Sequence, residues 1–365
     1  MNAQGKIRNE GRADNRPRSN ILGRRPTVKY ALVVLAIMMA AFAAAQLVPG
    51  GTEESSADAY TIDLGVSTSV TGAVWSGDTL TFSTAANNHT YTFTGSRASL
   101  SVVFPAGVTT TVTMNGVTVS TSGTITLNGT ANVTLLLEGT NKITGNVIVP
   151  STASLTIDSA TVPGSSDGSL TVTPNGTASN SVSAWIAGIG GQGTNATNGA
   201  NRNAGAITIN GGTVVSSGGY AAAGIGGSHW GAGGTISITG GTVIATGNTQ
   251  GAGIGGGRAG AGGTASISGG TVTAVGGNST SGGAGIGGGN GAAGSTLVIS
   301  SDADVKAYAN GSLPAIHAAS VASESTGYYA NAHFAAAVST TSATAMNIYG
   351  NNDVSSSVDT VELPA

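Results

Sequence analysis

The chain has 365 residues with 60 glycines and no cysteine, and only 8% of its residues are charged and 4% aromatic. This balance is too apolar for a disordered chain and too poor in large side chains for a helical core, so small and β-branched residues must fill the interior. The formal net charge is −3, and eight of the 13 basic residues precede Tyr30. The rest of the chain is mildly acidic, which excludes the clustered basic surface that a nucleic-acid partner requires.

The N-terminus combines a basic segment with an apolar one. The apolar run extends from Ala31 to Ala45 and is followed by Pro49. Basic, then apolar, then small residues are typical of an export signal, so residues 1–59 are assigned to such a signal or to a membrane anchor with its linker. A membrane span needs about 20 apolar residues, which favours cleavage over an anchor. In both cases we expect the chain from residue 60 on to be extracellular or at the cell surface, and the membrane to be contacted only through an uncleaved N-terminal segment.

Residues 80–160 contain short, irregular repeats of alternating apolar and polar residues. The segments "TVTMNGVTVSTS", "NVTLLLEGTNKITG" and "ASLTIDSATV" place Met114, Leu137 and Ile157 at equivalent points, at spacings of 23 and 20 residues. This period-2 alternation predicts strands with one buried face. Four larger residues suit a wider first coil, whose open edge has to be capped; they are Phe82, Tyr91, Phe93 and Phe104.

A regular repeat of 29 residues follows. Ile209, Ile238 and Ile267 hold the same place in "AITINGGTVVSSGG", "ISITGGTVIATG" and "ASISGGTVTAVGG", and a degenerate fourth copy begins at Leu297. A glycine loop precedes each copy, and the central isoleucines of these loops are Ile189, Ile225, Ile254 and Ile286. Because there is no cysteine to form disulfides, the stacking of repeats must supply the stability of the exported chain.

Each repeat contains three short strand patterns, such as "AGIGG", "ISIT" and "TVIAT". Strands this short cannot bury a face alone, but equivalent residues stacked about 4.8 Å apart pair every backbone and bury columns of Ile and Val. Glycines at the corners permit positive φ or close approach between coils. The sequence therefore predicts an all-β fold with irregular caps, a right-handed parallel β-helix over residues 60–311 and a C-terminal cap over residues 312–365.

Two glycine loops, "GAGIGG" at 251–256 and at 283–288, match the G-x-G-x-x-G spacing of a dinucleotide-binding fold. That fold requires a following helix whose N-terminus meets the pyrophosphate. The segment "GRAGAGG" that follows the first loop is a very poor helix former, and the motif recurs with the repeat. We therefore expect no nucleotide partner.

The repeats also resemble a known family. "NVTLLLEGTNKITG", "ASLTID" and the "AGIGG…ITINGGTV" units are similar to an extracellular parallel β-helix family of bacterial and archaeal surface proteins, described as carbohydrate-binding domain-containing proteins. The similarity covers roughly residues 100–350. It implies a polysaccharide or cell-surface glycan as the partner, with Ca²⁺ in some members and no other cofactor.

Residues with catalytic chemistry are sparse, and no catalytic residue is assigned. The four histidines have no metal-ligand spacing. Asp302 and Asp304 are the candidate metal ligands because two neighbouring carboxylates can share a Ca²⁺ ion; a turn with two solvated carboxylates is the alternative. A glycoside hydrolase would need paired carboxylates flanking the scissile bond. We therefore expect that the protein is not an enzyme.

The most informative variation follows each "GIGG". At the second position after this motif, three successive copies carry His229, Arg258 and Asn290. Stacking of the coils would place these three residues in a column beside Trp230. A Trp ring next to Arg and Asn donors suits a sugar, and Arg suits a uronate carboxylate. The alternative is a set of exposed loop residues that are free to vary. Two other aromatic residues stand at coil edges without a partner in the next repeat, Trp185 and Tyr220.

Three functions remain open at this point. The favoured one is a secreted or cell-surface, non-catalytic polysaccharide-binding module, which predicts an exposed polar and aromatic column. A passive structural or adhesive rod predicts flat Thr and Ser faces without a cleft, and such hydroxyl ladders also permit binding to ice or to a mineral. A polysaccharide lyase or hydrolase predicts clustered carboxylates in a groove.

Overall fold

A computed structural model describes residues 58–175, 184–193, 202–300, 302–310 and 313–322, and the strands at 333–334, 336–342, 345–350 and 359–360. The chain divides into two units, Met1–Ser55 and Ser56–Ala365, and all described residues belong to the second. The predicted export signal therefore lies almost wholly outside the described residues. Within the described part, no helix is long and apolar enough to cross a membrane.

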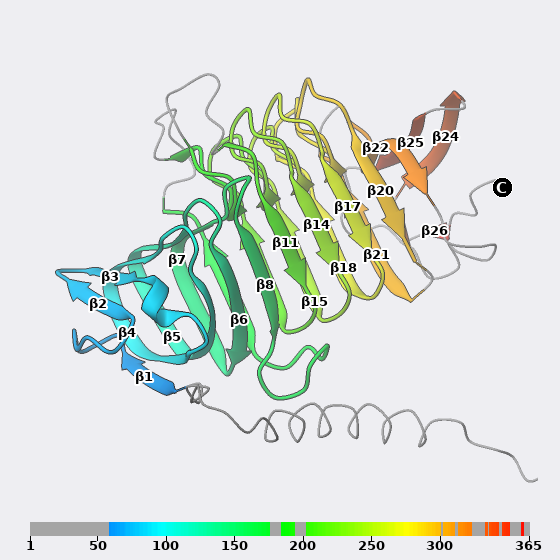
Figure 1. The fold of residues 1–365 in the computed structure, drawn as a ribbon. Coiled ribbons are helices and arrows are strands. Elements are labelled where there is room, and N and C mark those ends of the chain that lie inside the picture. Colours follow the sequence, from blue (N-terminus) through cyan, green and yellow to red (C-terminus); the bar gives the residue numbers. More distant parts are fainter. Residues whose placement is uncertain are drawn as a thin grey trace, which may run out of the picture. The chain divides into compact units, whose positions relative to one another are not determined.

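The strands of the second unit form a parallel β-helix whose coils have three faces (Figure 1). Face A contains β1 (Ala59–Asp63), the first parts of β4 (Thr90–Phe104) and β5 (Thr109–Leu127), and then β6 (Asn132–Glu138), β8 (Ser154–Ser159), β11 (Ala206–Ile209), β14 (Thr235–Ile238), β17 (Thr264–Ile267) and β20 (Ser295–Ile299). Face B contains the middle parts of β4 and β5, the first part of β7 (Thr140–Ile148), and then β9 (Ser169–Thr173), β12 (Thr213–Ser217), β15 (Thr242–Thr246), β18 (Gly270–Val275) and β21 (Ala303–Tyr308). Face C contains β3 (Thr79–Phe82), the last parts of β4, β5 and β7, and then β10 (Ile189–Gly190), β13 (Ile225–Gly226), β16 (Ile254–Gly255), β19 (Ile286–Gly287) and β22 (Ile316–Ala322).

The inward-facing residues of successive coils lie directly on one another. On face A, Ile209 pairs with Ile238 and Ile238 with Ile267, and all three side chains are buried. The degenerate fourth copy joins the same register, because Leu297 pairs with Ala265. On face C the stacked isoleucines are Ile189, Ile225, Ile254 and Ile286. The predicted 29-residue repeat, the three strands per coil and the parallel β-helix are confirmed.

Glycine is required in the short face C strand of each later coil. Gly190, Gly226, Gly255 and Gly287 stack in register, with φ values between 129° and 141°. A Cβ atom at Gly226 would overlap the carbonyl oxygen of Gly255 in the next coil. Only glycine fits such a position. The spacing that resembles a dinucleotide motif therefore serves coil stacking, and no helix follows it in residues 257–263.

The irregular early coils were predicted only in part. Met114 pairs with Leu137, as expected, but Ile157 pairs with Leu135 and not with Leu137, whose partner is Ser159. A shift of two residues keeps every side chain on its own face, so the alternation in the sequence does not distinguish the two registers. β8 ends at the buried Ser159, and the loop begins at the next residue, Ala160.

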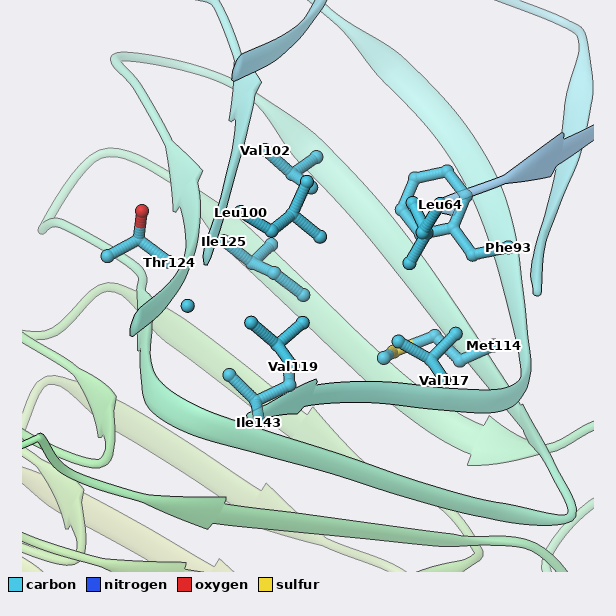
Figure 2. Close-up of a pocket in the computed structure, with 11 residues that line it drawn as sticks. Leu64, Phe93, Leu100, Val102, Met114, Val117, Val119, Thr124, Ile125 and Ile143 are labelled. Atoms are coloured by element: carbon cyan, nitrogen blue, oxygen red, sulfur yellow. The ribbon is translucent and has the colours of Figure 1, made fainter. Parts of the chain in front are cut away.

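The interior of the first coils contains the large aromatic residues, as predicted for the beginning of the β-helix. Phe82 stacks on Phe104 with ring centroids 4.4 Å apart and contacts the ring of Tyr91 edge-on at 4.9 Å. A cavity of about 10 Å³ lies nearby between β4, β5 and β7 (Figure 2). Its lining is apolar except for Thr124, and this volume holds at most about one water molecule. The cavity is therefore a packing defect and not a ligand site.

Both ends of the described β-helix change from parallel to antiparallel pairing. At the first end, β2 (Ala73–Ser76) forms an antiparallel pair with β3. At the other end, β22 pairs in parallel with β19 and β20 and antiparallel with β25 (Ala345–Gly350), which also pairs with β24 (Ala336–Ser342). A separate two-stranded sheet contains β23 (His333–Phe334) and β26 (Asp359–Thr360). The parallel pairing thus extends through β22, past residue 311, before the pairing changes direction.

Candidate ligand-binding corner

The loops that lead from face C to face A stack at one edge of the later coils. We call this edge the C–A corner; it comprises residues 228–234, 257–263 and 289–294. The backbone N–H of Trp230 donates to the carbonyl oxygen of Arg258 at 2.8 Å, and the N–H of Ala259 donates to that of Asn290 at 2.8 Å. These hydrogen bonds place the three predicted polar residues on successive coils.

His229 does not share the exposed position expected for it. Its side chain is only 3% exposed, and its ring stacks on Trp230 with centroids 3.9 Å apart and contacts Trp185 edge-on at 4.6 Å. Neither imidazole nitrogen has a hydrogen-bond partner among the described residues. Burial, with Arg258 and Arg202 nearby, lowers the pKa of His229 to about 4. The ring is therefore neutral at neutral pH. It packs inside the corner against Trp185 and Trp230, whereas the repeat alone predicts an exposed side chain.

Arg202 completes this cluster and was not identified from the sequence. Its guanidinium carbon lies 4.6 Å from the ring centroid of Trp230, and Nη1 donates to the carbonyl oxygen of His229 at 3.1 Å. Arg202 is 2% exposed, and burial lowers its pKa. Trp185, which the repeat left without a partner, contacts Trp230 edge-on at 5.4 Å. In the next coil the equivalent backbone positions carry Gly231 and Ala221, so periodicity does not predict these two side chains.

Trp230 has an unusual backbone conformation. Its φ is 64°, in the left-handed region, where the equivalent residues of the next coils are Ala259 (φ 56°) and Gly291 (φ 78°). For a bulky side chain this conformation is a genuine outlier, and such outliers persist only where surrounding contacts enforce them. The turn recurs in the next two coils, so the repeat imposes the conformation, and the contacts with His229 and Arg202 hold the bulky side chain in it. The Trp230 side chain nevertheless remains 39% exposed.

The C–A corner is also a local positive site. Residues 168–301 contain no Asp or Glu, and Arg202 and Arg258 are the only Arg or Lys residues in this stretch. Arg258 is exposed and Asn290 is half-buried on the coils that follow Trp230. The corner thus combines a partly exposed indole, an exposed guanidinium and a second guanidinium beneath them. The distribution of charged residues along the sequence identifies both arginines, because they are the only Asp, Glu, Lys or Arg residues between positions 168 and 301.

The candidate metal ligands lie on a different part of the coil. Asp304 faces outward from β21 on face B, opposite Thr271, and its carboxylate is 3.8 Å from the Nζ atom of Lys306. Asp302 is exposed in the turn before this strand. Across the ranges that the structure describes, no group of three or more His, Cys, Asp or Glu side chains is suited to hold a metal ion. The Ca²⁺ site at Asp302 and Asp304 stays a prediction.

These features define the class of the protein as a parallel β-helix built from repeated coils. Three segments of the chain, residues 207–229, 236–258 and 266–290, match the family model described as a beta helix repeat. The matched units end at His229, Arg258 and Asn290, the three residues that share the C–A corner. No curated protein and no solved structure shows a significant match to the chain.

Proposed function

We propose that this protein is a non-catalytic, carbohydrate-binding β-solenoid that acts outside the cell, and that the C–A corner binds the sugar. The observation that supports this best is the conformation of Trp230, a large aromatic residue that is kept partly exposed at a position where the next coils carry Ala and Gly. The turn itself recurs in the next coils, but a bulky residue in the left-handed region is costly, and such costly positions cluster at ligand sites. A partly exposed indole provides the apolar surface on which sugar rings pack.

The charge of the corner favours an acidic glycan. Arg258 is exposed next to Trp230, and no carboxylate exists within residues 168–301 to neutralise it. A guanidinium binds a carboxylate through two parallel hydrogen bonds, a geometry that a neutral hydroxyl does not offer. A polysaccharide of uronic acids presents one carboxylate per residue. We therefore infer that such a polymer binds more tightly than a neutral one.

The same stretch of sequence supports a binding role over a hydrolytic one. Glycoside hydrolysis by the usual mechanism requires two carboxyl groups that flank the scissile bond. The coils that carry the C–A corner contain none between residues 168 and 301. A sugar bound beside Trp230 and Arg258 would therefore lack both an acid and a nucleophile from the coils of these two residues.

A polysaccharide array tests this proposal. The purified chain would be applied to polyuronates and to neutral polymers, and the same polymers would be assayed for released reducing or unsaturated sugars. We expect binding to polyuronates, weaker binding to neutral polymers and no release. Absence of binding to every polymer would refute carbohydrate recognition, and sugar release would refute a non-catalytic role.

A further inference from the structure

The outward-facing residues of face A form two ladders of hydroxyl groups along the β-helix. Seven of the eight positions of the first ladder and five of the seven positions of the second are Thr or Ser. The first ladder consists of Thr90, Thr111, Thr134, Thr156, Thr208, Ser237, Ser266 and Val298. The second, two residues earlier in each strand, consists of Thr109, Asn132, Ser154, Ala206, Thr235, Thr264 and Thr296.

The two ladders have regular spacings. Neighbouring rungs are about 4.8 Å apart across the strands, and the two ladders are about 6.6 Å apart along them. No register shift interrupts the ladder positions between β5 and β20, whose face A strands lie side by side in Figure 1. All the rungs are exposed or half-exposed. The β-branched Thr side chains are stiff at χ1, so the hydroxyls are held at nearly fixed positions.

The chemistry of the ladders narrows the kind of partner. None of the fifteen positions is charged, which disfavours a mineral surface, since its cations prefer carboxylate ligands. None is aromatic, which disfavours a crystalline polysaccharide, since sugar rings pack on aromatic side chains. Small soluble ligands prefer concave, mostly apolar sites. What remains is a neutral, flat and periodic partner that hydrogen-bonds at fixed spacings.

We propose that face A binds ice. The water molecules of an ice face form a neutral, flat and periodic array, and each of them can donate to and accept from a hydroxyl group. The ladder array extends about 34 Å from β4 to β20, so many weak hydrogen bonds would form together. This inference does not depend on carbohydrate binding, because the C–A corner and face A use different residues.

Inhibition of ice recrystallisation by the full chain tests this inference. Thr208→Tyr places a large ring in the middle of the first ladder, between Thr156 and Ser237. We expect the wild-type chain to keep ice grains small and Thr208→Tyr to lose this effect. Thr235→Lys, at an exposed rung of the second ladder, should lose it as well, because a strongly hydrated ammonium group disrupts the neutral ladder.

The matched control is Thr273→Tyr, the same substitution at an outward-facing position of β18 on face B, between Ile244 and Lys306. Its inhibition should equal that of the wild type, and circular dichroism should show β-structure in all variants. A wild-type chain without any effect on ice grains would overturn the inference. Equal activity of the wild type, Thr208→Tyr and Thr235→Lys would overturn it too, as would equal loss in Thr208→Tyr and Thr273→Tyr.

Discussion

At the scale of single residues, the C–A corner shows how a repeat produces a unique site. Trp230 and Ala259 share the same backbone place in neighbouring coils, yet only Trp230 is enclosed by a buried histidine and a buried arginine. The repeat supplies the backbone positions, and two side chains that do not recur, those of Arg202 and Trp185, supply the contacts. The contacts that enclose Trp230 therefore depend on side chains that do not recur.

The burial of His229 predicts a pH dependence of stability. Its pKa is about 4 in the folded chain, against about 6.5 when unfolded, so the unfolded chain takes up a proton first as the pH falls. The stabilisation that this pKa difference provides is on the order of 3 kcal/mol. It is fully present above pH 6.5 and is lost as the pH falls to about 4. The free energy of unfolding, measured with urea at pH 7 and at pH 4, should therefore decrease less on acidification in His229→Phe than in the wild type.

The control for this measurement is His89→Phe, which removes a histidine outside the corner, where its Nδ1 accepts from the backbone N–H of Asp58. This variant should keep most of the wild-type loss of stability on acidification. Burial also lowers the pKa of His317, so part of the pH dependence persists in His229→Phe. An identical loss in His229→Phe and in the wild type would show that His229 is accessible to protons in the folded chain.

Trp230 should dominate the affinity for a glycan. Trp230→Ala is expected to weaken binding of a polyuronate by about 2 kcal/mol, or about 30-fold, as for aromatic residues at the centre of binding sites. The matched control is Trp75→Ala, because Trp75 also lies beneath a guanidinium, that of Arg97 at 4.7 Å, but belongs to the first coils. Calorimetric titration should show a large loss for the first variant and none for the second. Equal affinities of both variants would place the sugar elsewhere.

At the scale of the secondary-structure elements, each strand presents one row of side chains inward and one outward. Ile238 on β14 is fully buried in the stack of face A, whereas Ile244 on β15 points outward and is 38% exposed. The two residues have the same side chain and belong to the same coil. They therefore provide a direct comparison of the two directions.

Ile238→Asp should destabilise the chain by more than about 4 kcal/mol, because it buries a carboxylate without a partner between two isoleucines. Ile244→Asp should cost at most about 1 kcal/mol, mainly from the lower strand propensity of Asp. Thermal unfolding followed by circular dichroism measures both changes. Equal melting temperatures of the two variants would show that the inward and outward rows are assigned wrongly.

At the scale of the whole molecule, the sequence predicts the regular coils better than the irregular ones. The spacing of Ile209, Ile238 and Ile267 is constant, so stacking leaves one register for the later coils. In the early coils, Ile157 pairs two residues away from the predicted partner, because a two-residue shift preserves the alternation. Periodicity thus predicts which face a residue occupies more securely than which residue it contacts.

The same limit applies to the candidate site. Stacking predicts that Arg258 and Asn290 follow one another, but it does not predict that the side chain of His229 turns inward, since this depends on the contacts with Trp185 and Trp230. Arg202 holds the backbone position that Gly231 and Gly260 hold in the next coils, but the repeat does not predict that its side chain packs against Trp230. The contacts of loop residues require the three-dimensional structure.

The proposed recognition of an acidic glycan by the C–A corner is tested most directly by a calorimetric titration of the wild-type chain and Arg258→Ala with a polyuronate and with its methyl ester. Esterification should weaken binding to the wild type, because it removes the carboxylate that Arg258 is proposed to bind. Arg258→Ala should lose about tenfold or more in affinity for the charged polymer, as for other charge-assisted hydrogen bonds, and should no longer distinguish the two polymers. Equal affinity of the wild type for both polymers, or unchanged affinity of Arg258→Ala for the polyuronate, would contradict it.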